Sequence, residues 1–303
     1  MMSETAVVRA TLFTDPGCPW AYSARPAFAR LNWRFGSQID WRLVLIGLSE
    51  DTDRYAARGF TPATQAAGWA GFQRRFGMPF ALLVKPRLAP TTRACRAIIA
   101  AREIDPVIGE GALLALQLLQ FTTIGVLDDD DHLLAALRRV DGLNADAVVA
   151  AIDDPAIESL YESDKALARS AEGTPIHVQD RHSTSDGPVR YTAPSVVFEH
   201  RDGRRVDVGG FQPFESYDNA LANLDGSLER RAAPAGPLEA LAAFPHGLTT
   251  AEVAAVMRPS DLAEEERAGA ARQLLPLTHE GAVVCEPAGA DALWRAAARA
   301  SYS

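Results

Sequence analysis

The stretch TDPGCPWAYSARP, residues 14–26, decides the fold that this sequence predicts. It follows AVVRATLFTD, an apolar run typical of a buried strand that ends near Phe13, and it opens with the turn residues DPG. From Pro19 to Phe35 apolar residues recur at helical spacing, and proline suits the first turn of a helix. Cys18 is therefore expected at the beginning of a helix, directly after a strand.

The residues that follow extend this pattern into a larger unit. IDWRLVLIGL, Ile39 to Leu48, is typical of a second strand, and strand, helix and strand within roughly 40 residues predict a βαβ unit with parallel strands. Much later, PSVVFEHRDGRRVDVGGF has two apolar runs around the turn RDGR, which predicts a β-hairpin. QPFESYDNALANLDGSL predicts a helix after this hairpin.

Residues 51–172 lie between these two parts and carry helical patterns. These are TTRACRAIIAAREI, EGALLALQLLQFTTIGVL, DDDHLLAALRRV and NADAVVAAI. Thr91 or Thr92 is expected to cap the first helix and the aspartates 128–131 to begin the third, because negative charge favours a helix N-terminus. A cation site at these aspartates is the alternative.

The order of elements predicts an α/β protein with a thioredoxin fold and an inserted helical domain. The βαβ half is expected over residues 1–50, the helical insertion over 51–172 and the ββα half over 173–230.

After the linker-like RRAAPAGP, residues 237–303 are expected to form a separate winged-helix-like domain. LEALAAF, LTTAEVAAVM and DLAEEERAGAARQLL predict three helices, with Thr249 and Glu252 at the spacing of a capping box. THEGAVVCEP predicts a strand or β-wing, and ADALWRAAARA a final helix. Because the third helix is rich in acidic residues, which repel phosphate, packing or homodimerisation is expected rather than DNA binding.

The composition indicates which partners and which cellular location to expect. A net charge of -9 over 303 residues argues against nucleic-acid and anionic-membrane partners. No apolar run has the length of a membrane span, and Met1 to Ala10 do not read as a signal peptide, so a cytoplasmic location is expected. The three cysteines are sparse and far apart in sequence, which suits a reducing compartment and not a disulfide framework.

The three cysteines differ in their expected chemistry. A helix N-terminus stabilises a thiolate, and the turn before Cys18 is expected to hold its sulfur near the surface. Cys95, on the apolar side of ACRAII, and Cys285, in an apolar wing strand, are expected to be small buried hydrophobic residues.

FTDPGCPWAYSARPAFARLNWRFG and the later YTAPSVVF resemble the active-site segments of the DsbA-like family of the thioredoxin superfamily. This group includes FrnE-type proteins, 2-hydroxychromene-2-carboxylate isomerases and kappa-class glutathione transferases, and the resemblance spans roughly residues 6–230. It implies that Cys18 is the nucleophile and that Pro194 is a cis proline facing it; an ordinary loop proline is the alternative. It also implies that the backbone of Ala193 pairs with a bound thiol compound or peptide, and that Pro19 and Trp20 line the site.

Ala21 departs from the pattern of a dithiol enzyme, whose second cysteine resolves the mixed disulfide. Unless Cys95 or Cys285 approaches Cys18, a monothiol route remains, with glutathione or mycothiol as co-substrate and no bound cofactor or metal. Two alternatives stay open. One is a thiol-dependent isomerase or transferase in which Cys18 orients the thiol, and the other is a redox-silent adaptor with a protein partner.

Two further parts of the chain could border the pocket. Tyr22 and Ser23 could face it, although Tyr22 is expected in the core. The polar loop HVQDRHSTSDG, which holds His177 and His182, is expected to contact a polar substrate rather than a metal.

Overall fold

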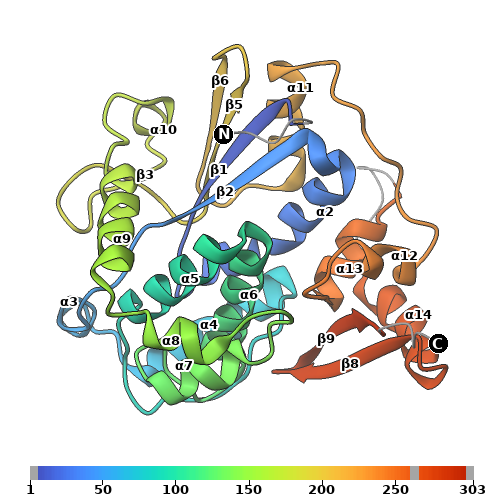
Figure 1. Cartoon of the computed structure of the whole chain (residues 1–303), viewed down its shortest axis with the longest axis horizontal. Coiled ribbons are helices and arrows are strands. Elements are labelled where there is room, and N and C mark those ends of the chain that lie inside the picture. The colour runs from blue at the N-terminus through green and yellow to red at the C-terminus, as the bar shows by residue number, and fades with distance from the viewer. Residues whose placement is uncertain (1–5, 260–265, 298–303) are drawn as a thin grey trace.

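The computed structural model describes residues 6–259 and 266–297 (Figure 1). Its main sheet has the strand order β2 (Ile39–Leu45), β1 (Val8–Thr14), β5 (Ser195–His200) and β6 (Arg205–Gly209). β1 and β2 are parallel, whereas β5 is antiparallel to both β1 and β6. This is the predicted thioredoxin fold, with βαβ and ββα halves joined in one sheet.

The helix and the second strand that follow β1 differ from their predicted extents. The helix is divided into α1 (Pro19–Ser23) and α2 (Arg25–Phe35), with Ala24 between them. β2 ends at Leu45 rather than Leu48, because Gly47 takes a positive φ of 62°. A Cβ at Gly47 would overlap the Tyr161 hydroxyl, so the chain turns here where a glycine permits it.

The insertion is largely helical, as predicted. Asp129 caps α7 by accepting a hydrogen bond from the His132 N–H, so the aspartates begin this helix. Within residues 6–259 and 266–297 no group of His, Cys, Asp or Glu has the arrangement of a metal site. Between the sheet's halves the chain forms α3 (Asp53–Ala57), α4 (Pro62–Phe76), α5 (Thr92–Ile104), α6 (Pro106–Thr122), α7 (Asp130–Leu137), α8 (Ala145–Ala150), α9 (Pro155–Ala168), α10 (Pro175–Val178) and the short strands β3 (His182–Ser183) and β4 (Arg190–Tyr191).

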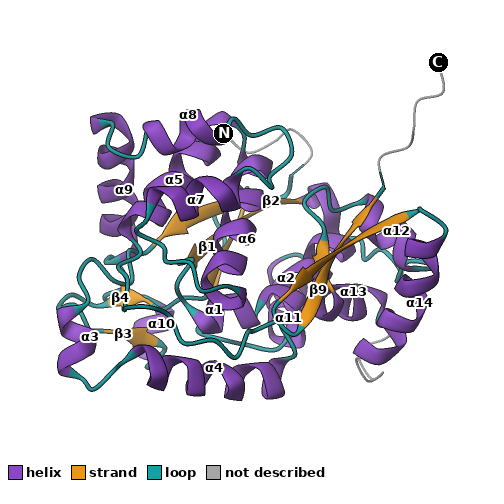
Figure 2. Cartoon of the chain, turned by 90° about the horizontal axis from the view of Figure 1, so that it is seen from below, coloured by secondary structure: helices purple, strands orange, loops and turns teal. Residues whose placement is uncertain are grey.

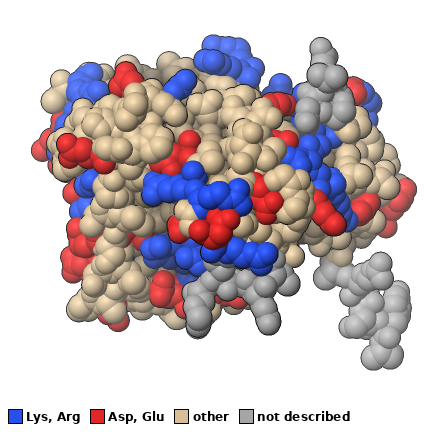
Figure 3. Space-filling model, turned by 90° about the horizontal axis from the view of Figure 1, so that it is seen from above, with Lys and Arg blue, Asp and Glu red and all other residues tan. Residues whose placement is uncertain are grey.

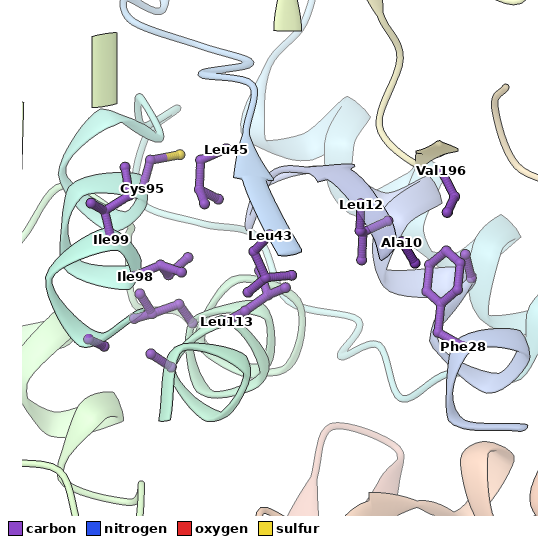
Figure 4. Close-up of a cluster of buried hydrophobic side chains, with 14 of the residues drawn as sticks. Ala10, Leu12, Phe28, Leu43, Leu45, Cys95, Ile98, Ile99, Leu113 and Val196 are labelled. Carbon is purple, nitrogen blue, oxygen red and sulfur yellow. The ribbon is translucent and has the colours of Figure 1, made fainter. Parts of the chain in front are cut away.

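The two faces of the sheet have separate cores, because side chains alternate along each strand. On one face, Leu43 and Leu45 of β2 pack toward α5 and Leu113 of α6, while Ala10 and Val196 lie near the α2 side chain Phe28 (Figure 4). α11 (Phe214–Leu224) covers the same face. On the other face, side chains from the ends of α9, from α10 and from β4 form a smaller cluster.

The C-terminal residues form a small unit with a three-stranded sheet in the order β7-β9-β8. Its described elements follow the order helix, strand, helix, helix and two strands, which is compatible with the predicted winged-helix-like domain. The expected capping box of Thr249 and Glu252 is present. The elements are α12 (Pro237–Ala242), β7 (Leu248–Thr249), α13 (Thr250–Met257), α14 (Arg267–His279), β8 (Val283–Ala288) and β9 (Asp291–Ala296).

The predicted final helix is wrong, because ADALWRAAARA begins with strand β9. β9 pairs with both β7 and β8, so non-local pairing overrides the helix propensity of its alanines. The first part of the predicted third helix, residues 261–265, lies outside the described residues.

The C-terminal unit packs closely on the first half of the chain, beside α2 (Figures 1 and 2). Arg25 Nε of α2 lies 2.8 Å from Glu252 Oε1 of α13, and Trp33 of α2 shares a buried cluster with Leu274 of α14. The expected boundary at residue 237 stays a prediction, since these contacts join the unit to the thioredoxin core.

The surface carries charges of both signs. On the face in Figure 3, Lys and Arg side chains lie beside Asp and Glu side chains, without an extended patch of one sign. None of the described helices combines the length and the apolar composition needed to cross a membrane.

Candidate active site

Cys18 is the N-cap residue of α1, as predicted. Its backbone is extended, and Pro19 follows at the first helical position. The Cys18 N–H donates to the Asp15 carbonyl at 3.2 Å, and the Cys18 carbonyl accepts from the Tyr22 N–H at 3.0 Å. The DPG turn and the first turn of α1 thus fix the cysteine backbone from both sides.

Pro194 lies against this cysteine from the far end of the sequence. The Ala193–Pro194 peptide bond is cis, as the resemblance implied, and it directly precedes β5. The Cys18 thiol donates to the Ala193 carbonyl oxygen, with Sγ and O 3.1 Å apart. The antiparallel pairing of β1 with β5 brings these segments together, because Phe13 pairs with Ser195.

The expected exposure of the Cys18 sulfur is wrong, because this residue is only 5% exposed. Burial raises the pKa of the thiol to about 12; the N–H groups of Ala21 and Trp20 oppose the rise, and the charge of Asp15 adds to it. The helix N-terminus therefore acts in the expected direction, but α1 has five residues and desolvation is the larger effect. The thiol is protonated at neutral pH.

Asp15 forms a buried polar centre under the turn, a role that the turn pattern DPG does not indicate. Its carboxylate accepts hydrogen bonds from the N–H groups of Gly17 at 2.8 Å and Leu48 at 2.7 Å. The Thr91 hydroxyl donates to it at 3.1 Å. Thr91 is the N-cap residue of α5, as expected, but its hydroxyl makes this bond instead of a capping bond. Burial raises the pKa of Asp15.

The other two cysteines are free. Cys95 is buried as predicted, and its sulfur lies 3.6 Å from an oxygen of the Asp15 carboxylate. Cys285 was expected to be buried, but it is exposed, whereas Val283 and Ala288 at the two ends of the same strand, β8, are buried.

Trp20 and Tyr22 have opposite surroundings. The Trp20 side chain is 41% exposed and its ring contacts Phe72, Phe76 and Phe211, at centroid distances of 4.8, 5.7 and 5.7 Å. Tyr22 is fully buried, as expected for a core aromatic residue, and its hydroxyl donates to the Pro79 carbonyl at 2.9 Å.

Two cavities lie near α1. α4 passes close to α1 (Figure 2). Residues of both helices line a cavity of about 190 Å³, here called the turn cavity. A second cavity of about 370 Å³, the arginine cavity, includes the buried Ser23 in its wall. The turn cavity is lined by Gly17, Pro19, Leu48, Ser49, Thr52, Tyr55, Phe60, Thr64, Gln65, Gly68, Trp69, Phe72, Leu88, Ala89, Thr91 and Gln120. The side chains of Arg30, Arg75, Arg258 and Arg267 give the arginine cavity its name.

The polar loop contributes to a third cavity instead of the turn cavity. Asp186 of this loop lines a space of about 300 Å³ with Arg54, Lys165 and Arg169. His177 and His182 pack on each other with ring centroids 4.8 Å apart. The expected contact of the polar loop with a substrate stays a prediction.

Comparison with known proteins places this geometry in a family. The chain matches the DSBA-like thioredoxin domain family over residues 10–193. The probable DsbA oxidoreductase of Streptomyces coelicolor is 20% identical with a TM-score of 0.51, over 73% of this chain and 91% of that one.

The cytosolic disulfide reductase DsbM of Pseudomonas aeruginosa is 18% identical with a TM-score of 0.48, over 73% of this chain and 98% of that one. No curated protein matches the chain. The family match covers more than half of the chain and includes the Cys18 turn and Ala193, so the chain belongs to the DSBA-like thioredoxin domain family.

Proposed function

We propose that the chain is a thiol–disulfide oxidoreductase that acts through one thiol, Cys18, with a low-molecular-weight thiol as co-substrate. One observation carries the proposal: the Cys18 sulfur, at the N-cap of α1, lies 3.1 Å from the carbonyl oxygen that precedes the cis proline. Glutathione and mycothiol are the candidate thiols, and a reducing cytoplasm would supply either of them.

The exchange has two balanced steps. The Cys18 thiol loses its proton and attacks a disulfide RSSR, which gives Cys18–S–S–R and releases RSH. A second small thiol then attacks this mixed disulfide, which restores Cys18 and forms a new disulfide. Ala21 stands where a dithiol enzyme has its second cysteine, and the Cys95 thiol donates a hydrogen bond to the Asp15 carboxylate. We therefore expect the second step to depend on an external thiol.

The residues around the sulfur suit a substrate on this side of α1. The Ala193 carbonyl, which accepts from the thiol, would accept from a substrate N–H once the sulfur is in a mixed disulfide. Pro19 and Trp20 would form the apolar wall, together with Pro194. The single-cysteine CPWA motif with this cis proline favours the FrnE-like part of the family.

Burial of Cys18 favours a second candidate, a redox-silent binding protein. A thiol whose pKa is raised to about 12 is almost entirely protonated at neutral pH and reacts slowly. In a third candidate, a thiol-dependent isomerase or transferase, Cys18 would orient a bound thiol without attacking.

Turnover of a small disulfide by the wild-type chain and by Cys18→Ser separates these functions. Glutathione and mycothiol serve in turn as reductant, and Cys285→Ser is the control for reaction at the exposed cysteine. We expect Cys18→Ser to abolish thiol-dependent turnover and Cys285→Ser to retain it. Unchanged turnover in Cys18→Ser would refute the monothiol route. Thiol-dependent conversion of an isomerase or transferase substrate by Cys18→Ser would favour the third candidate, and absence of any reaction in the wild-type chain the second.

A further inference from the structure

The turn cavity adjoins the proposed nucleophile. Its wall includes Gly17 and Pro19, the two chain neighbours of Cys18. A molecule in this cavity therefore lies beside the turn that carries the sulfur, although Cys18 itself is not one of the lining residues. The space of about 190 Å³ accommodates a small molecule or one side chain, but not a folded partner.

The lining of this cavity has a distinct chemistry. Among the described residues, its wall contains no charged side chain. Four aromatic rings provide apolar surface, and hydroxyl and amide groups provide uncharged donors and acceptors. The aromatic residues are Tyr55, Phe60, Trp69 and Phe72; the uncharged polar ones are Ser49, Thr52, Thr64, Gln65, Thr91 and Gln120.

Three charged groups near the cavity already have partners. Lys85 Nζ lies 6.0 Å from the centroid of the Trp69 ring and donates to the Leu119 and Gly125 carbonyls. Asp15 lies beneath the turn and already accepts hydrogen bonds from Gly17, Leu48 and Thr91. Arg190, whose charge acts weakly on Cys18, is paired with Asp186 at 2.8 Å. A charged group that entered the turn cavity would lose hydration without gaining a partner, which is costly.

The arginine cavity has the opposite character and is set apart by aromatic rings. Trp20 contacts Phe72, which lines the turn cavity, and also Phe76 and Phe211, which line the arginine cavity. The two cavities on either side of this aromatic cluster therefore differ in charge preference. A carboxylate-bearing disulfide matches the arginine cavity better than the turn cavity, because four arginines and one carboxylate, that of Glu215, line the arginine cavity.

From this lining we infer that the turn cavity selects uncharged, hydroxyl- or amide-bearing thiols and disulfides as the substrates of Cys18. The inference rests on the proposed function and names its substrate class. In the step concerned, Cys18–SH and a neutral RSSR give Cys18–S–S–R and RSH, with the thiol proton transferred to solvent and then to the departing thiolate. Charged thiols such as glutathione are disfavoured, and neutral sugar-bearing thiols such as mycothiol are favoured.

Three disulfides of similar length test this selection. They are 2-hydroxyethyl disulfide, which is neutral, cystamine, which is cationic, and 3,3′-dithiodipropionate, which is anionic. The rate of adduct formation at Cys18 is measured at pH 8 by peptide mass spectrometry, in a Cys285→Ser background that removes the exposed thiol. Each rate is divided by the rate of the same disulfide with the free peptide TDPGCPWAYS, which corrects for intrinsic reactivity.

We expect the normalised rate of the neutral disulfide to exceed both others by about tenfold or more. Normalised rates that agree within about threefold would overturn the inference but leave the proposed function standing. A preference for the anionic disulfide would overturn it in favour of the arginine cavity. If the peptide reacts and Cys18 reacts with none of the three, both the proposed function and the inference fail.

Isosteric variants place a charge in the turn cavity. Gln120→Glu on α6 and Gln65→Glu on α4 each add one carboxylate to its wall. We expect each to raise the cystamine rate relative to the dithiodipropionate rate by about tenfold, through Coulombic attraction. The matched control is Gln273→Glu at an exposed position of α14. An equal change in the control, or no change in either cavity variant, would overturn the assignment of this cavity.

Discussion

The pH dependence of alkylation at Cys18 follows from its burial. The perturbation is a pH series from 6 to 11 with iodoacetamide, followed at the Cys18 peptide by mass spectrometry. At pH 7.5 an ordinary thiol is about one-tenth ionised. A thiol with a pKa of about 12 is ionised to only about three parts in 100,000 at that pH.

The two thiols also differ in nucleophilicity, since a more basic thiolate attacks faster. The thiolate fractions of the two thiols differ by roughly three and a half powers of ten. A Brønsted coefficient of about 0.4–0.5 makes the Cys18 thiolate intrinsically more reactive by roughly one and a half powers of ten, which offsets part of this difference. Cys18 is therefore expected to react about one hundredfold more slowly at pH 7.5 than a free cysteine peptide, before any steric shielding.

The raised pKa of Cys18 also determines how the alkylation rate changes with pH. The thiol is neutral below its raised pKa, so the rate rises about tenfold per pH unit and shows no plateau up to pH 10. The exposed Cys285 in the same sample is the internal control and reacts faster at neutral pH. A plateau with a midpoint below about pH 8.5 would refute the reasoning, because the helix N-terminus would then outweigh desolvation.

Three sets of substitutions test other parts of the account. Gly17→Ala places a Cβ 2.6 Å from Thr91 Cγ2 and is expected to cost about 2 kcal/mol in urea unfolding. Thr91→Ser removes that methyl group and keeps the hydroxyl, so it should lower the cost to under about 1 kcal/mol; strictly additive effects would contradict this. Arg25→Met strands the buried Glu252 carboxylate and is expected to cost about 2 kcal/mol, partly recovered by Glu252→Gln; no loss of stability would show that the pair does not hold α13 on α2. Ala21→Cys is expected to release the mixed disulfide without added thiol, as mass spectrometry of the intact protein would show. An adduct that persists would contradict the assignment of residue 21 as the position of the resolving cysteine.

Local sequence patterns were enough to predict the secondary-structure elements that carry the site. The apolar run before DPG, and Pro19 after Cys18, determine a strand and a helix start from adjacent residues, and the structure has both. The hairpin after Pro194 and the capping box at Thr249 are equally local and were also predicted correctly. Each of these depends on residues within a few positions of one another.

The features that the sequence did not predict depend on distant residues. Cys18 is buried because Ala193, far away in sequence, lies against its sulfur. Asp15 became a polar centre through donors from Leu48 and Thr91, which no spacing reveals. Likewise, the exposure of Cys285 depends on which parts of β8 the rest of the C-terminal unit covers, since Val283 and Ala288 of the same strand are buried.

The central claim is that Cys18 exchanges disulfides with an external thiol as the only resolving group. The most direct measurement is the release rate of a preformed Cys18 mixed disulfide, followed by the mass of the intact protein at increasing thiol concentration. The account predicts an adduct that persists without thiol and a release rate proportional to thiol concentration. Release without added thiol, with loss of two hydrogens from the protein as Cys18 pairs with Cys95, would contradict it.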